Sequence, residues 1–273
     1  MTEVHAHLGA YLQPGREPRG LELSKYKINV HISKALRQCH FFTKSSQFIK
    51  RGPRVRLQEA LTMDYIARNT TIRVPRVLDI FTIHGVVHIV QESIDGPVLE
   101  DVWSRLSPEE QRGSMAQLKN CLDQLRALKP PHPERVQAVD GSGLIDGRVE
   151  SGVWGPFDNH AAFHRFLNHD ILRANPRYPR VQEALSRIYG KRYKTVFSHG
   201  DLGPHNVLWK DGCIVVIDWE RSGWFPEYWD YTRVHAARGH MTGWWTMFKE
   251  TVDHRYDDEV ELAVRISEYF EML

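Results

Sequence analysis

Residues 197–220 read Phe-Ser-His-Gly-Asp-Leu-Gly-Pro-His-Asn-Val-Leu-Trp-Lys-Asp-Gly-Cys-Ile-Val-Val-Ile-Asp-Trp-Glu. They contain the pattern His-x-Asp-x-x-x-x-Asn at His199, Asp201 and Asn206, and an apolar run at 214–217 that ends at a second acid, Asp218. This order of loop, short strand, turn, strand and acid suits phosphoryl transfer from a magnesium-bound nucleotide. One carboxylate can accept the proton of an attacking hydroxyl, while an amide and the second carboxylate hold the metal on the phosphates.

Asp201 is the first candidate for the catalytic base, because a hydroxyl needs a proton acceptor as its bond to phosphorus forms. An isolated aspartate more often caps a helix or forms an Asx turn, and that alternative remains open for Asp201 taken alone. Its position between His199 and Asn206 favours the catalytic role. We expect His199 to orient the loop through hydrogen bonds rather than to serve as the base. His205, in the same loop, is given no role.

Asn206 and Asp218 are the candidate magnesium ligands. The side-chain carbonyl of Asn206 can reach a metal ion that bridges the phosphates. Asp218 ends an Ile-Val-Val-Ile run, where a buried charge is costly without a cation. The alternatives are a turn-capping amide for Asn206 and a solvent-exposed strand end for Asp218.

Lys50 is the candidate for the cation that holds the phosphates, because it ends a short expected strand at 47–50 ahead of an expected helix at 54–69. Glu59 on that helix would pair with Lys50 and orient its ammonium group toward the phosphates. Other nearby cations compete for this role, and an exposed strand lysine is the simplest alternative; the competitors are Lys44, Arg51 and Arg54. We expect the adenine to bind backbone groups in a hinge formed by Glu92, Ser93 and Ile94.

The order of the expected elements predicts an α+β fold of two lobes. A mobile arm at 1–25 precedes a small β-rich lobe at 26–94, which has one main helix and a hairpin of strands at 77–83 and 86–91 turning at His84-Gly85. A larger, mostly helical lobe at 95–273 contains the catalytic loop and the acceptor site. Ser107-Pro108-Glu109-Glu110 is typical of a helix start. The expected helices of this lobe lie at 108–128, 157–172, 179–189, 226–237, 242–251 and 257–272, and a long loop is expected at 130–155.

Composition narrows the possible partners and location. The net charge of +2 and the pI of about 8.4 are too mild to indicate a nucleic-acid partner. The three cysteines fit no zinc or CxxC pattern, which favours reduced thiols. No stretch approaches 18 consecutive apolar residues, and no leader is evident. We therefore expect a cytoplasmic protein that binds neither a membrane nor nucleic acid; the oligomeric state stays open.

The chain resembles the aminoglycoside phosphotransferase and choline kinase superfamily, which has a protein-kinase-like fold. The matching residues are His199-Gly200-Asp201-Leu202-x-x-x-Asn206, Ile217-Asp218-Trp219-Glu220, Ser222-Gly223-x-x-Pro226-x-x-x-Asp230, Lys50-x-Gly52-Pro53, Glu59-Ala60 and 91–96. The resemblance implies that Asp201 is the base, that Asn206 and Asp218 bind Mg²⁺, and that Lys50, paired with Glu59, binds phosphate. Gly200, in place of arginine, and Asp-Trp-Glu, in place of Asp-Phe-Gly, set the chain apart from protein kinases.

The expected function is an ATP-dependent or GTP-dependent transfer of the γ-phosphoryl group to a hydroxyl of a small molecule. The alternative is a kinase-like nucleotide-binding or regulatory protein with little or no activity, because 34–47 contains no glycine to cover the phosphates. The acceptor is left open. Several acids could attract a cationic acceptor or could simply be solvated, namely Asp158, Asp170, Glu220 and Glu227.

Overall fold

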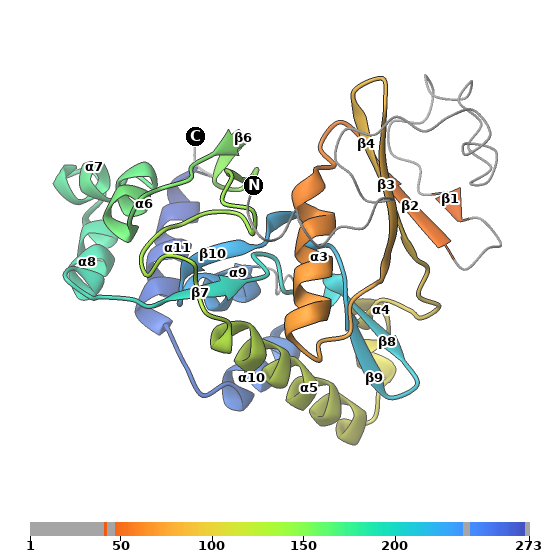
Figure 1. Ribbon diagram of the computed structural model, residues 1–273. Coiled ribbons are helices and arrows are strands. Elements are labelled where there is room, and N and C mark those ends of the chain that lie inside the picture. Colours follow the sequence, from red (N-terminus) through yellow and green to blue (C-terminus); the bar gives the residue numbers. More distant parts are fainter. Residues whose placement is uncertain (1–40, 43–46, 237–240, 271–273) are drawn as a thin grey trace.

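Four antiparallel strands form the sheet of the N-terminal part (Figure 1). The computed structural model describes residues 41–42, 47–236 and 241–270, so the expected arm at 1–25 and most of the glycine-free stretch lie outside the described residues. The sheet order is β1-β2-β4-β3, with β1 at Phe41–Phe42, β2 at Gln47–Arg51, β3 at Val77–Ile83 and β4 at Val86–Glu92. His84 and Gly85 both have positive φ angles, 48° and 75°, which a tight hairpin turn requires. The predicted hairpin is confirmed.

The register of the sheet decides where Lys50 points. Lys50 lies opposite Ile89 on β4, and Ile49 lies opposite Val90. Ile89 belongs to the main core, whereas Val90 and Phe81 form a small cluster with Ile49. Because paired residues share a face and neighbours along a strand alternate, Lys50 lies on the same face as the main core.

Helix α3, at Leu57–Asn69, lies against that face of the sheet (Figure 1). It begins three residues later than expected, because Gly52 accepts a hydrogen bond from the Val55 amide and the chain turns before the helix. The helix buries Ala60, Leu61, Met63 and Ile66, and it also buries the acidic side chain of Glu59, which is only 2% exposed.

The C-terminal part is mostly helical, and short two-stranded sheets lie within it. Strand β7, at Thr195–Ser198, pairs with β10, at Gly223–Pro226, and β8, at Val207–Lys210, pairs with β9, at Cys213–Val216. An isolated bridge between Val98 and Leu208 holds the segment that leaves the N-terminal sheet against β8. The helices that follow this segment are α4 at Leu99–Val102, α5 at Pro108–Ala127, α8 at Pro179–Ile188, α9 at Trp229–Ala236, α10 at Thr242–Thr251 and α11 at Asp257–Phe270.

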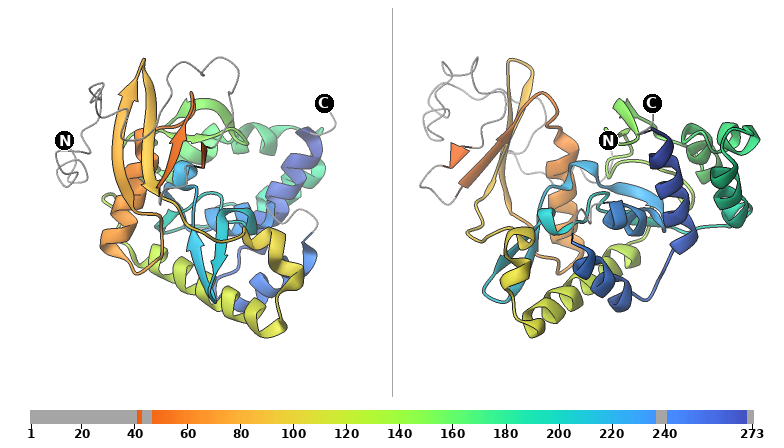
Figure 2. Two further views of the ribbon diagram at one scale, coloured as in Figure 1. Left: turned by 90° about the vertical axis from the view of Figure 1, so that its right-hand side faces the viewer. Right: turned by 180° about the vertical axis from the view of Figure 1, so that it is seen from behind.

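Two segments differ from the sequence prediction. The expected loop at 130–155 contains a hairpin of β5, at Leu144–Asp146, and β6, at Glu150–Trp154. The helix expected at 157–172 is two helices, α6 at His160–Phe166 and α7 at His169–Ala174, because Asn168 adopts a left-handed conformation with φ of 60°. Seen from behind, α6, α7 and α8 lie at the opposite end of the molecule from the N-terminal sheet (Figure 2, right).

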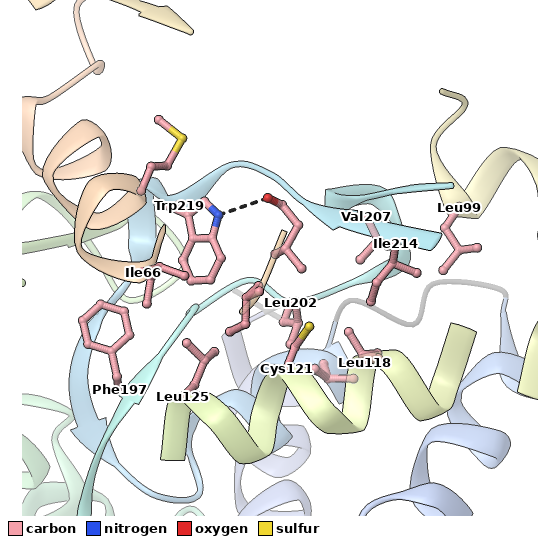
Figure 3. Packing of buried hydrophobic residues seen from close by; sticks show 14 of the residues in the cluster. Ile66, Leu99, Leu118, Cys121, Leu125, Phe197, Leu202, Val207, Ile214 and Trp219 are labelled. Carbon is pink, nitrogen blue, oxygen red and sulfur yellow. Dashed lines mark hydrogen bonds between the residues drawn. The ribbon is translucent and has the colours of Figure 1, made fainter. Parts of the chain in front are cut away.

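One hydrophobic core joins α3 to the C-terminal part (Figure 3). Trp219, which is 1% exposed, packs near Ile66 of α3, and its indole nitrogen donates to the Val216 carbonyl at 3.1 Å. Leu118, Cys121 and Leu125 of α5 line the other side. This packing places the chain around Trp219, including Asp218 and Glu220, directly beside α3.

Helix α5 begins with a capping box formed by Ser107 and Glu110. The Ser107 hydroxyl accepts from the Glu110 amide at 3.3 Å, and the Glu110 carboxylate accepts from the Ser107 amide at 2.8 Å, which forms a capping box. We expect Ser107→Ala to cost about 1 kcal/mol of unfolding free energy and to lower the melting temperature by about 2–4 °C. Glu109→Ala, a control that leaves the box intact, should have the smaller effect in the same thermal melt. Equal losses from the two changes would contradict the prediction.

Candidate active site

The candidate catalytic loop begins at the end of β7 and is held by Asp230 at the start of α9. The buried Asp230 carboxylate accepts from the backbone amides of His199, at 3.0 Å, and Gly200, at 2.8 Å. Burial raises the pKa of Asp230 to about 6, although the two amide donors favour its ionised form. Asp230 therefore fixes the backbone on which Asp201 is presented.

His199 connects this loop to the chain just before Asp218. Its side chain is fully buried, and its Nε2 atom donates to the Ile217 carbonyl at 3.0 Å while Nδ1 accepts from the Asp201 amide at 3.2 Å. Burial lowers the pKa of His199 to about 4, so the ring is neutral near pH 7 and can play both hydrogen-bonding roles. Both of these hydrogen bonds join the ring to backbone groups, and neither involves the Asp201 carboxylate.

The Asp201 carboxylate lies between two arginines. Oδ1 accepts from Nη1 of Arg148 at 2.7 Å, and Oδ2 accepts from Nη1 of Arg221 at 2.6 Å. His205, to which the sequence analysis gave no role, brings Nε2 within 3.7 Å of Oδ2. Burial alone would raise the pKa of Asp201, but His205 and the two arginines hold it well below its usual range.

Sequence reasoning missed both arginines. Arg221 directly follows Glu220, the last residue of the stretch 197–220. Its place next to that stretch could have indicated that it belongs to the site. Arg148 lies in the turn between β5 and β6, 53 residues before Asp201, in a segment whose composition indicates a loop. Asp146 holds Arg148 in place, because its carboxylate accepts from Nε at 2.8 Å and from Nη2 at 2.7 Å.

Lys50, Glu59 and Asp218 come together from distant parts of the chain. Nζ of Lys50 lies 2.9 Å from Oε1 of Glu59, 2.6 Å from Oδ1 of Asp218 and 3.5 Å from Oε2 of Glu220. Burial lowers the pKa of Lys50, but the three carboxylates outweigh burial and raise it above the ordinary value. Burial raises the pKa of Glu59 to about 7, and the Lys50 charge only partly opposes this shift. Lys50 therefore stays charged.

The same acids provide a donor set that suits a hard divalent cation. Glu59, Asp218 and Glu220 each offer one carboxylate oxygen, and these oxygens lie within 4.8 Å of one another. Mg²⁺ prefers such oxygen ligands. Glu220, which the sequence analysis considered only as a charge that might attract the acceptor, belongs to this group. Asn206 donates from Nδ2 to the Asp201 carbonyl at 2.9 Å, which orients its amide and leaves Oδ1 without a donor among the described residues.

The expected hinge residues follow the last residues of β4. The Glu92 amide donates to the Arg76 carbonyl at 2.9 Å, so this part of the backbone is already used. Ser93 and Ile94 are half-buried, and their backbone groups make no hydrogen bond with any residue that the structure describes. The backbone groups of Ser93 and Ile94 can therefore bind a ligand, whereas the Glu92 amide already donates to the Arg76 carbonyl.

Gly200 has no room for a side chain. Its φ is +80°, and a Cβ atom there would overlap the backbone carbonyl of Arg221, whose carbon lies 3.0 Å away. We expect Gly200→Ala to displace Asp201 and Arg221 and to lower kcat/KM for transfer by about 100-fold, as small misplacements of reacting groups do. Gly212→Ala is the matched control, because φ at Gly212 is +76° but nothing lies within 4 Å of the added atom. Steady-state rates of both variants test this; equal rates would show that the close approach at Gly200 has no importance.

The two-part arrangement is the protein-kinase-like fold of solved phosphotransferase structures. A model of the phosphotransferase enzyme family matches residues 41–265, and the chain belongs to that family. This confirms the resemblance drawn from the motifs. No curated protein matches the sequence.

Two solved structures with related folds support the fold assignment. The apo form of a thermostable mutant of aminoglycoside phosphotransferase APH(4)-Ia has 15% identity and a TM-score of 0.54, over 85% of this chain and 84% of that one. A choline/ethanolamine kinase family protein from Mesorhizobium loti has 16% identity and a TM-score of 0.52, over 90% of this chain and 80% of the other. None of the helices within the described ranges has the length and apolar character needed to cross a membrane.

Proposed function

We propose that the protein transfers the γ-phosphoryl group of ATP or GTP to a hydroxyl of a small molecule, with Asp201 as the base and with Asn206 and Asp218 as ligands of Mg²⁺. The observation that supports this most strongly is the 2.6 Å contact between Lys50 Nζ and Asp218 Oδ1, which are 168 positions apart. It joins the candidate phosphate-binding cation of the sheet to the candidate metal ligand that follows β9. A phosphotransferase needs both groups at the same phosphates.

In this proposal, Lys50 binds the phosphates and Glu59 keeps its ammonium group in place. Glu59 is buried on α3 and lies 2.9 Å from Nζ, so it limits the positions that the lysine side chain can take. The contact between Lys50 and Asp218 is then exchanged for contacts to phosphate oxygens when the nucleotide binds. A salt bridge of this kind keeps the buried lysine paired until then.

When bound, Mg²⁺ would offset the negative charge that develops as the γ-phosphoryl group moves. Asp218 and Asn206 are the ligands that we assign to it, and Glu220 lies close enough to Asp218 to add a further oxygen. The adenine or guanine would bind the free backbone groups of Ser93 and Ile94, beside Glu92, in a hinge between lobes at 26–94 and 95–273.

Asp201 would position the acceptor hydroxyl and take its proton. The transition state of phosphoryl transfer is loose, so the hydroxyl loses its proton late and a weakly basic carboxylate is sufficient. The arginine contacts keep Asp201 ionised and therefore able to accept a hydrogen bond. One of its oxygens must become available before the acceptor can bind.

The direct test is the release of nucleoside diphosphate from ATP or GTP in the presence of Mg²⁺ and a panel of small alcohols. We expect release that requires both an added alcohol and the metal. Binding of the nucleotide without any alcohol-dependent release across the panel would instead support the inactive, regulatory alternative.

A further inference from the structure

Two arginines contact Asp201, and a third lies on α9, the helix whose Asp230 binds the His199 and Gly200 amides. Arg148 comes from the β5–β6 hairpin, Arg221 ends the short helix Trp219–Arg221, and Arg233 lies on α9. Strand β5 packs against the short helix, which brings the first two arginines together. Burial and the nearby charge of Arg148 lower the pKa of Arg233 to about 10, while Asp146 and Asp201 oppose this shift. The charges of Arg148, Asp146 and Asp201 therefore act on Arg233.

The acids of this region do not balance these charges. The carboxylates that accept hydrogen bonds from these arginines are Asp146, whose side chain is only 3% exposed, and Asp201. Glu220 forms a longer ion pair with Arg221, at 3.8 Å from Nε, but it also lies with Glu59 and Asp218 around Lys50. In the proposed complex, Lys50 and Mg²⁺ neutralise that second group of acids. Three guanidinium groups then face two carboxylates on the acceptor side.

Of these three arginines, Arg233 is the one with a buried donor that has no acceptor. Its Nε atom is buried and has no hydrogen-bond partner, and its guanidinium forms no ion pair with any carboxylate in the described part of the chain. Its guanidinium carbon lies 4.2 Å from the centre of the Trp229 ring, which stabilises the charge but accepts no N–H bond. A buried donor without an acceptor is costly, so this group is ready to bind an external anion.

We propose that the acceptor alcohol carries an oxyanion group, a carboxylate or a phosphate, which binds to Arg233 together with Arg148 and Arg221. This inference rests on the proposed phosphotransferase function and names its acceptor class. Arginine binds planar oxyanions through paired N–H donors, and each of these side chains has five donors. Arg148 can therefore keep its bonds to Asp146 while it turns a donor toward the ligand.

Binding of such an acceptor would also free the base. Both oxygens of Asp201 are occupied by guanidinium groups, at 2.7 Å and 2.6 Å. An acceptor oxyanion draws one of these groups away, and the acceptor hydroxyl takes its place. The hydroxyl oxygen then bonds to the γ-phosphorus, its proton passes to Asp201, the bond from the γ-phosphorus to the β,γ-bridging oxygen breaks, and nucleoside diphosphate leaves.

The acids that could have attracted a cationic acceptor have other partners. Asp158 lies 3.7 Å from Arg135, Asp170 lies 3.9 Å from Arg165, and Glu227 lies 2.9 Å from Arg126. None of them contacts Asp201 through a hydrogen bond or an ion pair among the described residues. The charges next to the base therefore disfavour amino-alcohols and polyamine sugars.

The test compares alcohols that share a carbon skeleton and differ in one terminal group. Gluconate, sorbitol and glucamine form one such set, and glycerate, glycerol and 3-amino-1,2-propanediol form another. With ATP and Mg²⁺, we expect the highest kcat/KM for the anionic member of any set that is phosphorylated, by at least tenfold over the cationic member. A cationic or neutral member that reacts equally well or better would overturn the anionic acceptor but uphold the phosphotransferase function.

Variants of Arg233 test whether the preference for an anionic alcohol depends on this arginine. We expect Arg233→Gln to raise KM for the anionic alcohol at least tenfold, with KM for ATP unchanged, and Arg233→Lys to restore part of the affinity. Arg187→Gln, which removes one charge from the exposed face of α8, should have neither effect. An unchanged KM for the anionic alcohol in Arg233→Gln would overturn the proposal.

A separate readout applies if no alcohol reacts, a result that would sink the phosphotransferase proposal. Gluconate should then still raise the melting temperature of the parent protein more than sorbitol does, and this difference should vanish in Arg233→Gln. Equal shifts with gluconate and sorbitol in the parent protein would overturn the anion site as well.

Discussion

Asp201→Asn is expected to lower the rate of phosphoryl transfer by about 10²–10⁴-fold, the range associated with loss of a general base. The amide has nearly the same shape as the carboxylate but cannot take the proton of the hydroxyl. It also weakens the contacts to Arg148 and Arg221, which hold the carboxylate at 2.7 Å and 2.6 Å. Binding of the magnesium nucleotide should change little, because Asp201 forms no contact with Lys50, Glu59 or Asp218.

Single-turnover rates, with nucleotide affinity measured by calorimetry, test this prediction. Asp211→Asn is the matched control, because Asp211 lies in the exposed β8–β9 turn and its φ of 50° is a conformation that asparagine tolerates. Parent-like transfer in Asp201→Asn would remove Asp201 from the role of base. A parallel loss of nucleotide affinity would show that the residue acts on the fold of the site.

Asp218→Asn is expected to remove most of the effect of Mg²⁺ on nucleotide binding. Asp218 has φ of 62°, so asparagine preserves the left-handed backbone, whereas alanine would add strain to the loss of charge. The carboxylate is the nearest acid to Lys50, at 2.6 Å, and one of three whose oxygens lie within 4.8 Å of one another. Without its charge, we expect the affinity for nucleotide in the presence of Mg²⁺ to fall at least tenfold, which is about 1.4 kcal/mol.

Calorimetric titrations of ATP with Mg²⁺ and with a chelator distinguish this effect from general damage. In the variant, affinity without the metal should stay near the parent value, because Lys50 and Glu59 remain paired at 2.9 Å. The same increase in affinity on adding Mg²⁺ in the variant and the parent would rule out Asp218 as a metal ligand.

Local sequence signals predicted the parts of the fold that depend on local interactions. The β3–β4 hairpin follows from β-branched runs around His84-Gly85, and the start of α5 follows from the capping box at Ser107. Strand β10 was not predicted, because its pairing with β7 joins Gly223–Pro226 to residues about thirty positions earlier and leaves no local pattern. The expected helix at 226–237 therefore began too early, since α9 starts at Trp229.

The candidate site also contains residues that the sequence identifies and residues that only the tertiary structure reveals. Asp201, Asn206 and Asp218 lie within one motif, and Lys50 with Glu59 could be placed through the resemblance to known kinases. Arg148 could not be identified from the sequence, because its contact with Asp201 depends on a three-residue strand, β5, in a segment rich in glycine. The pairing of Asp201 with two arginines arises from tertiary packing, and it is the basis on which we propose an anionic acceptor where the sequence left the acceptor open.

The most direct test of the central claim is the mass of the acceptor after incubation with ATP, Mg²⁺ and either the parent protein or Asp201→Asn. The account predicts an alcohol that gains one phosphoryl group with the parent protein, together with an equal amount of nucleoside diphosphate. Almost none of this product should form with the variant, although it still binds nucleotide. Release of inorganic phosphate with no phosphorylated alcohol, or equal product from parent and variant, would contradict it.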